Sequence, residues 1–194
     1  MNYLAHLYFS DPEPLAWAGS LMGDFLKGPL PEAVDPLLLK HLQLHRKIDS
    51  FAHENPHFQR SCKRVARHYR FGRGILIDVF YDHFLASNWT ELSDQPLEDF
   101  SQRVYAGLNE CQHLMPAGMQ NLLPRMARDN WLVSYREESV VETVLCSLER
   151  RIRHRLPLAR GVEDLQLYRG ALEDDFKGFF VEATDFVGRW KAAY

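Results

Sequence analysis

The chain has 194 residues, of which 46% are hydrophobic and 25% are charged, as is usual for a soluble globular protein. This length predicts one domain with a core large enough to fold without disulfides. The net charge of −3 and the lack of any long apolar run predict neither a nucleic-acid nor a membrane partner. Three widely spaced cysteines argue against a disulfide framework and against a zinc finger.

The N-terminal sequence MNYLAHLYFSDPEP has no basic region and no long apolar stretch. A secretory signal peptide requires both, so we expect none. The sequence therefore predicts a cytoplasmic protein with reduced thiols.

Helix boundaries in the first half of the chain are marked by capping residues. A short apolar segment covers residues 2–9, and three Asx-Pro pairs then follow, because a short polar side chain before proline suits a helix start. These pairs predict helices from Asp11-Pro12 to about Gly28, from Asp35-Pro36 through residue 54, and from Asn55-Pro56 to about residue 69. Two glycines at 72 and 74 separate the last of these from a helix over 74–89.

The second half of the chain is predicted to be helical as well. We expect helices from Pro96 to about residue 115, from Pro116 to about residue 136, and over residues 161–190. Ser139 and Glu142 have the spacing of a capping box, which predicts another helix start between them. No segment alternates as a strand would, so the predicted fold is all-α, a single-domain multi-helix bundle over residues 1–194.

The segment GILIDVFYDHFLASNW at 74–89 is apolar on nearly every side, which predicts a buried helix. It nevertheless contains Asp78, Asp82 and His83. The two carboxylates are four residues apart and share a helix face, where they repel each other and burial penalises both charges. A divalent cation would neutralise both at once.

Other segments carry residues of the same kind. Asp24 lies in the apolar stretch SLMGDFL, and His45 and Asp49 in LHRKID share a face at i, i+4 spacing. His6 and His83 are outer candidates. Carboxylates mixed with imidazoles suit Mg²⁺, Mn²⁺ or Fe²⁺ better than structural zinc, which prefers thiolates.

Each residue also has a purely structural explanation. The histidines could be ordinary core residues, and Asp24 could cap a turn. Asp49 could pair with Arg46 or Lys47, and Asp82 could accept a hydrogen bond from Trp89 or from a backbone donor. The recurrence of the pattern on three apolar segments favours the metal site over these separate explanations.

Basic residues concentrate in residues 60–73, where no acidic residue interrupts them. They are Arg60, Lys63, Arg64, Arg67, Arg70 and Arg73, and a second cluster, RRIRHR, covers 150–155. In a slightly acidic protein this concentration is local, and it predicts a surface that binds an acidic partner. The alternatives are a solvated helix face or a patch that binds RNA or phospholipid.

Several motifs together resemble the acyl carrier protein phosphodiesterase family. They are MNYLAHL at 1–7, GDF at 23–25, LHRKID at 44–49 and DVFYDHFLASNW at 78–89, together with WLVSYRE at 131–137 and the RWKAAY tail. This family is regarded as a divergent branch of the HD-type metal-dependent phosphohydrolases. The usual adjacent His-Asp pair is absent from these motifs, since Arg46 follows His45 and Asp82-His83 reverses the order.

The resemblance implies an all-helical, HD-domain-like fold and a specific reaction. The enzyme would hydrolyse the phosphodiester between 4′-phosphopantetheine and a serine of holo-acyl carrier protein, with Mn²⁺ or Mg²⁺, and Fe²⁺ as a further option. We assign Asp24, His45, Asp78 and Asp82 as the metal ligands. Arg46 would contact phosphate, and His6 or His83 would protonate the departing serine. The acidic carrier protein would dock on Arg60, Lys63, Arg64, Arg67 and Arg70.

Two other functions remain open at this point. Another HD-type phosphohydrolase could act on a nucleotide or a small phosphate ester with the same metal site. A non-catalytic helical module could bind an acidic protein through residues 60–73, although this function leaves the buried acids unexplained.

Overall fold

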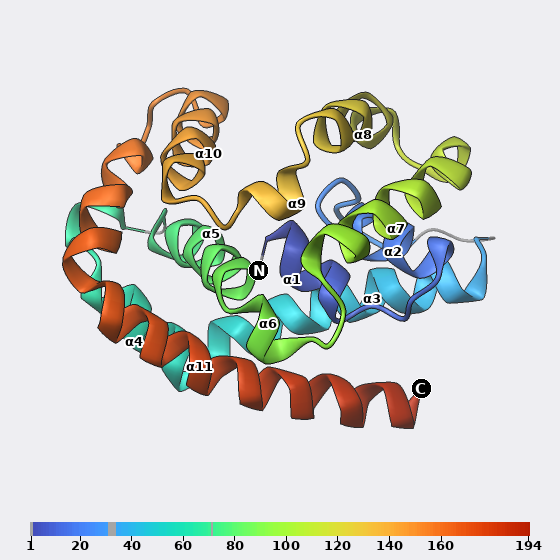
Figure 1. Ribbon diagram of the computed structural model, residues 1–194, viewed down its shortest axis with the longest axis horizontal. Helices are drawn as coiled ribbons and strands as arrows, with labels where there is room; N and C mark the ends of the chain where they lie inside the picture. Colours follow the sequence, from blue (N-terminus) through green and yellow to red (C-terminus); the bar gives the residue numbers. More distant parts are fainter. Residues whose placement is uncertain (1, 31–33, 71) are drawn as a thin grey trace.

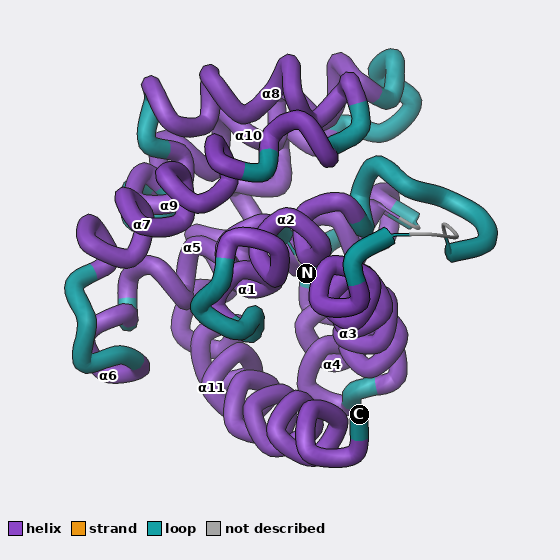
Figure 2. The backbone as a smooth tube through the Cα atoms, turned by 90° about the vertical axis from the view of Figure 1, so that its right-hand side faces the viewer, coloured by secondary structure: helices purple, strands orange, loops and turns teal. Residues whose placement is uncertain are grey.

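The computed structural model describes residues 2–30, 34–70 and 72–194, and within them it contains helices and no strand (Figures 1 and 2). The predicted all-α fold is confirmed. The first helices are α1 (Tyr3–Tyr8), α2 (Pro14–Met22), α3 (Pro36–Glu54), α4 (Pro56–Arg64), α5 (Gly72–Ser87) and α6 (Trp89–Leu92). The later ones are α7 (Leu97–Glu110), α8 (Ala117–Arg128), α9 (Trp131–Ser134), α10 (Glu138–Arg151) and α11 (Gly161–Ala193).

Two of the predicted helix starts are confirmed in detail. The side chain of Asp35 accepts the backbone N–H groups at the start of α3, and Asn55 does the same for α4. The remaining pair, Asp11-Pro12, does not start a helix, because α2 begins at Pro14 with Glu13 as its N-cap and ends at Met22. Asp24 therefore lies in the turn that follows α2 and not within a helix.

Three further boundaries differ from the prediction. Asn130, with φ of 42° in the left-handed region, separates α8 from α9 where one helix was expected. The predicted capping box at Ser139 and Glu142 is wrong. Helix α10 already begins at Glu138, after the N-cap Glu137, whose side chain makes no capping hydrogen bond. In addition, α4 ends at Arg64, and a short 3₁₀ turn covers residues 67–69.

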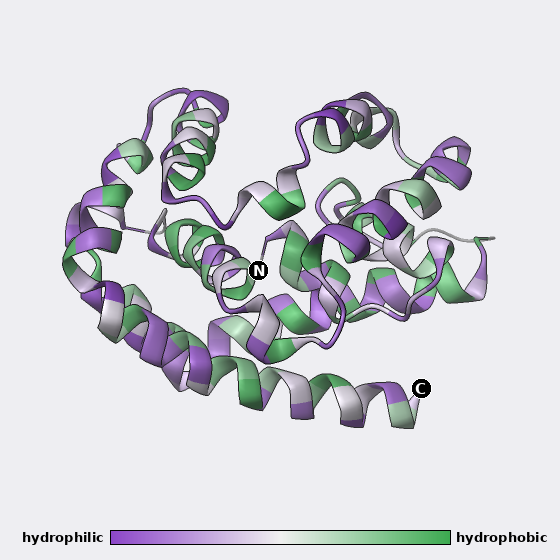
Figure 3. Cartoon of the chain, in the orientation of Figure 1, coloured by the Kyte–Doolittle hydropathy of each residue, from purple (hydrophilic) through white to green (hydrophobic). Residues whose placement is uncertain are grey.

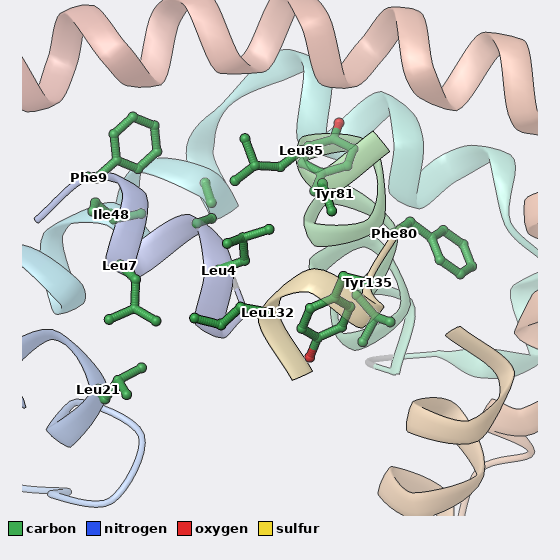
Figure 4. Packing of buried hydrophobic residues seen from close by; sticks show 14 of the residues in the cluster. Leu4, Leu7, Phe9, Leu21, Ile48, Phe80, Tyr81, Leu85, Leu132 and Tyr135 are labelled. Carbon is green, nitrogen blue, oxygen red and sulfur yellow. The ribbon is translucent and has the colours of Figure 1, made fainter. Parts of the chain in front are cut away.

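Helices α1 and α5 form the centre of the molecule. Four of the six residues of α1 are fully buried, and α5 is buried along most of its length, as its apolar sequence predicts. Figure 3 shows the hydrophobic colouring of these central helices, and Figure 4 shows side chains of α1, α5 and α9 meeting in the core. The short helix α1 thus has a fixed position deep in the fold.

The long helix α11 runs along one side of the molecule and bends at Tyr168, whose φ and ψ are not helical (Figure 1). It packs closely on α4, where a Cβ atom at Gly178 would lie 2.2 Å from the ring of His57. The buried carboxylate of Asp175 accepts hydrogen bonds from Arg60 and from Arg64, which links α11 to α4 at the same place. None of the described helices has the length and apolar character needed to cross a membrane.

Candidate metal centre

Two helices bring two histidines and a carboxylate together. His6 of α1 stacks on His45 of α3, with ring centroids 3.7 Å apart. Asp49, one turn after His45, lies between their outer nitrogens, 3.2 Å from His6 Nε2 and 3.3 Å from His45 Nε2. One candidate ligand atom from each residue lies within 4.8 Å of the other two. We call these three residues the His-Asp cluster.

The environment fixes the charges of His6 and Asp49. Burial and the neighbouring His45 together lower the pKa of His6 to about 3, although Asp49 offsets part of this effect. His6 is therefore neutral at physiological pH. Burial raises the pKa of the Asp49 carboxyl, but the adjacent His45 and His6 imidazoles lower it by more, so Asp49 stays ionised.

A turn after α2 adds a fourth donor next to the cluster. The nearer carboxylate oxygen of Asp24 lies 3.9 Å from His45 Nε2. The preceding residue, Gly23, lies against the imidazole itself, since a Cβ atom there would be 2.2 Å from His45 Cδ2. Glycine at this position lets the turn approach α3 closely enough for Asp24 to reach the cluster.

This donor set fits a divalent cation. Imidazole nitrogens together with carboxylate oxygens are the mixture that Mn²⁺, Fe²⁺ and Mg²⁺ accept. His45 is 2% exposed, whereas the side chains of Asp24 and Asp49 are 36% and 38% exposed, so the cluster opens to solvent on its acidic side. An ion held there would be accessible to water and to a substrate.

Asp78 and Asp82 differ from each other in their surroundings. Asp82 is fully buried, and its two carboxylate oxygens accept the backbone N–H groups of Leu4 and Ala5 at 2.8 and 3.1 Å. Burial is also the first cause that raises the pKa of Asp78, and the charge of Asp49 raises it further. The charge of Asp49 thus reaches Asp78. Asp82 instead holds the start of α1, the backbone-donor alternative considered from the sequence.

His83 and Arg46 have partners away from the His-Asp cluster. His83 Nδ1 lies 2.8 Å from the carbonyl oxygen of Tyr135, and its Nε2 lies 3.3 Å from Arg169. The guanidinium of Arg46 donates to the carbonyl oxygens of Leu26 and Gly28, which closes the chain segment after α2 onto α3. The catalytic roles expected for these two residues stay predictions.

The basic residues of 60–73 divide into two groups. Phe71, which lies in the same segment, is outside the described residues. Arg60 and Arg64 point to Asp175 of α11, so they serve at least in part to hold α4 on α11. Lys63, Arg67 and Arg70 are exposed. Lys63 and Arg70 also line a shallow pocket of about 410 Å³ together with His53, Arg73 and Gly74.

The fold and the site together define an all-helical protein with a candidate metal centre at its surface. The family model described as acyl carrier protein phosphodiesterase matches residues 1–183. The chain belongs to this acyl carrier protein phosphodiesterase family, as the sequence motifs predicted. No solved structure shows a significant match.

Curated relatives of the same name align over nearly the whole chain. The acyl carrier protein phosphodiesterase of Escherichia coli O6:H1 is 31% identical over 97% of this chain and 98% of its own length. The protein of that name from Shigella boydii serotype 18 is 31% identical over 93% of this chain and 94% of its own length. The one from Yersinia enterocolitica is 29% identical, again over 93% of this chain and 94% of its own length.

The sequence did not assign Asp49 to the metal site. Its i, i+4 spacing from His45 was visible, but the neighbouring Arg46 and Lys47 offered equally close partners. Arg46 turns to backbone carbonyls instead, which leaves Asp49 to His6 and His45. Only the position of α1, set by contacts distant in sequence, decides between these partners.

Proposed function

We propose that this protein is a divalent-metal-dependent phosphodiesterase that removes 4′-phosphopantetheine from the serine of holo-acyl carrier protein. The products would be apo-carrier protein and 4′-phosphopantetheine. The single observation that carries this proposal is the His-Asp cluster, because a phosphodiester is anionic and resists attack without charge neutralisation. Family membership supplies the substrate class.

We assign the metal to His6, His45, Asp49 and Asp24, with Asp78 as a further candidate. When bound, Mn²⁺ or Mg²⁺ would neutralise charge on the phosphate and lower the pKa of a bound water. His6 suits the role of a neutral ligand better than that of a proton donor, because burial and His45 lower its pKa to about 3. Asp49 is ionised and supplies negative charge to the cation. We leave Asp82 out of the ligand set, because both of its oxygens already bind the start of α1.

We place the carrier protein on the exposed basic residues Lys63, Arg67 and Arg70. Acidic partners are guided and oriented by complementary charge. His53, which shares the shallow pocket with Lys63 and Arg70, lies one helical turn after Asp49 on α3, and its Nδ1 is 2.8 Å from the Asp49 carbonyl oxygen.

Incubation with holo-carrier protein and Mn²⁺, followed by intact mass measurement, tests the proposal. We expect the carrier to lose the mass of the phosphopantetheine arm and expect EDTA to prevent this loss. Asp49→Asn should abolish the reaction. The same change at Asp185, which is exposed on α11 and pairs with Arg189, should leave it intact.

Two results would refute the proposal. A carrier of unchanged mass in the presence of Mn²⁺ would exclude this substrate. Full activity of Asp49→Asn would remove the His-Asp cluster from the mechanism. Hydrolysis of free small diesters without any effect on the carrier would favour the small-ester phosphohydrolase considered from the sequence.

A further inference from the structure

A second, larger pocket lies between α8, α9, α10 and the start of α1. Its volume is about 620 Å³, compared with about 410 Å³ for the shallow basic pocket, and this is enough to hold a small organic ligand. Its walls are mainly apolar, with Phe25, Leu122, Trp131, Val144 and Leu148 among them. Figures 1 and 2 show α8 and α10 on the same side of the molecule. We call it the α8–α10 pocket.

Two separate segments place this pocket directly beside the His-Asp cluster. In the turn after α2, Asp24 approaches His45, and the next residue, Phe25, lines the pocket. In α1, Tyr3 lines the pocket, and His6, three residues later on the same helix face, belongs to the cluster. The wall of the pocket and the cluster are therefore at most one helical turn apart.

Polar groups lie where the pocket meets the cluster. Burial and the charge of Asp24 together raise the pKa of Tyr3 to about 12, and the guanidinium of Arg151, which hydrogen-bonds the phenol oxygen, offsets part of this effect. The phenol is thus protonated at physiological pH and can donate a hydrogen bond. Arg151 lines the pocket as well, and it adds a positive charge that suits a phosphate at this point.

The cluster lies between this pocket and the basic surface along α3. Phe25 belongs to the turn that contacts His45, whereas His53 of the basic pocket lies two turns further along the same helix. A phosphodiester at the cluster would therefore have an apolar pocket on one side and positive charge on the other. A phosphodiester that joins an acidic protein to a long uncharged arm has the same asymmetry.

We propose that the α8–α10 pocket binds the pantetheine arm of the substrate, which leaves the carrier protein on the side of Lys63 and Arg70. This inference rests on the proposed function for the direction of the substrate. The arm is uncharged beyond its phosphate, carries amides and ends in a thiol, so an apolar pocket with a few polar groups suits it. Tyr3 and Arg151 would then act as positioning residues for the phosphate end.

A binding experiment tests the pocket without metal or turnover. Trp131 lines the pocket, whereas Trp17 and Trp89 are buried in the core. Titration of the metal-free protein with pantetheine, up to about millimolar concentration, should shift the indole N–H signal of Trp131 in an NMR spectrum. Trp131→Phe assigns that signal. A Trp131 signal that stays in place during the titration would overturn the inference.

A pair of variants on α10 tests the same pocket by activity. Ser147 lies on the pocket and is exposed, so Ser147→Trp should fill the pocket without disturbing the core. Glu142 is exposed about 140° around the same helix, and Glu142→Trp is the matched control. We expect kcat/KM for holo-carrier protein to fall by at least about tenfold in Ser147→Trp and by less than about twofold in Glu142→Trp. A small diester that lacks the arm should be hydrolysed at similar rates by both.

The outcomes separate the pocket from the proposed function. If the wild-type protein removes the arm and Ser147→Trp does so equally well, the pocket inference is overturned and the function stands. If the wild-type protein leaves the carrier unchanged, the function fails, and the pantetheine titration alone decides about the pocket.

Discussion

Replacement of Asp175 by asparagine should destabilise the fold without affecting the metal centre. The Asp175 side chain is 1% exposed and accepts hydrogen bonds from Arg60, Arg64 and Ser61. Asparagine has the same size but no charge, and its amide group would face a guanidinium. The contact between α4 and α11 then loses its two arginine–carboxylate pairs.

The magnitude follows from the burial of each partner. Removal of one partner from a fully buried ion pair costs about 3–5 kcal/mol. Here the side chains of Arg60 and Arg64 are 50% and 32% exposed, so water can solvate the released guanidinium groups. We therefore expect a loss of about 2–3 kcal/mol, which lowers Tm by roughly 4–12 °C in a chain of this length.

Urea and thermal denaturation of Asp175→Asn, with Asp185→Asn as the control, measure this loss. Asp185 pairs with Arg189 on the surface of the same helix, and its replacement should cost less than about 0.5 kcal/mol. Burial raises the pKa of Asp175, but Arg64 and Arg60 lower it by more, so its folded pKa is below the ordinary 3.8. The stabilisation is complete above pH 3.8 and is lost as the pH falls through the folded pKa. An Asp175→Asn variant as stable as Asp185→Asn at neutral pH would refute this reasoning.

Three further predictions concern the site and its surroundings. Burial raises the pKa of Asp82 from 3.8 to about 7, so the folded state binds more protons than the unfolded state between these values, and stability should fall as pH rises across this window by about 4 kcal/mol. Urea denaturation at a series of pH values should show that this slope disappears in Asp82→Asn, and an unchanged slope would contradict the assignment. Gly23→Ala should displace His45 and weaken Mn²⁺ binding by about 10–100-fold in an EPR titration, and unchanged affinity would contradict the contact described for Gly23. Charge reversal of the three exposed cations Lys63, Arg67 and Arg70 should raise KM for the carrier protein at least about tenfold and leave Mn²⁺ affinity unchanged. An unchanged KM would show that the carrier protein docks elsewhere.

The sequence predicted the helical fold well because its strongest signals are local. Asp35 and Asn55 cap their helices through backbone groups two and three residues away, so the chain itself contains all that is needed to predict them. The break at Asn130 depends on a left-handed conformation that many sequences with asparagine do not adopt. Local pattern alone therefore joined α8 to α9.

The site was predicted in part, for a related reason. His45 and Asp49 share a face of one helix, and any helical structure would keep them together. Asp82 was grouped with Asp78 by the same spacing, yet it binds the start of α1, nearly eighty residues away in the chain. No periodicity within α5 could indicate that partner.

The last helix has a consequence for the order in which the chain can fold. Lys191 of α11 donates to Asp11, which also accepts from Lys40 and His41 of α3. These contacts tie the helix that carries His45 to residues near the C-terminus. During synthesis these contacts can form only after α11 has left the ribosome. We therefore expect a nascent chain without α11 to hold His6 and His45 less firmly together than the complete fold does.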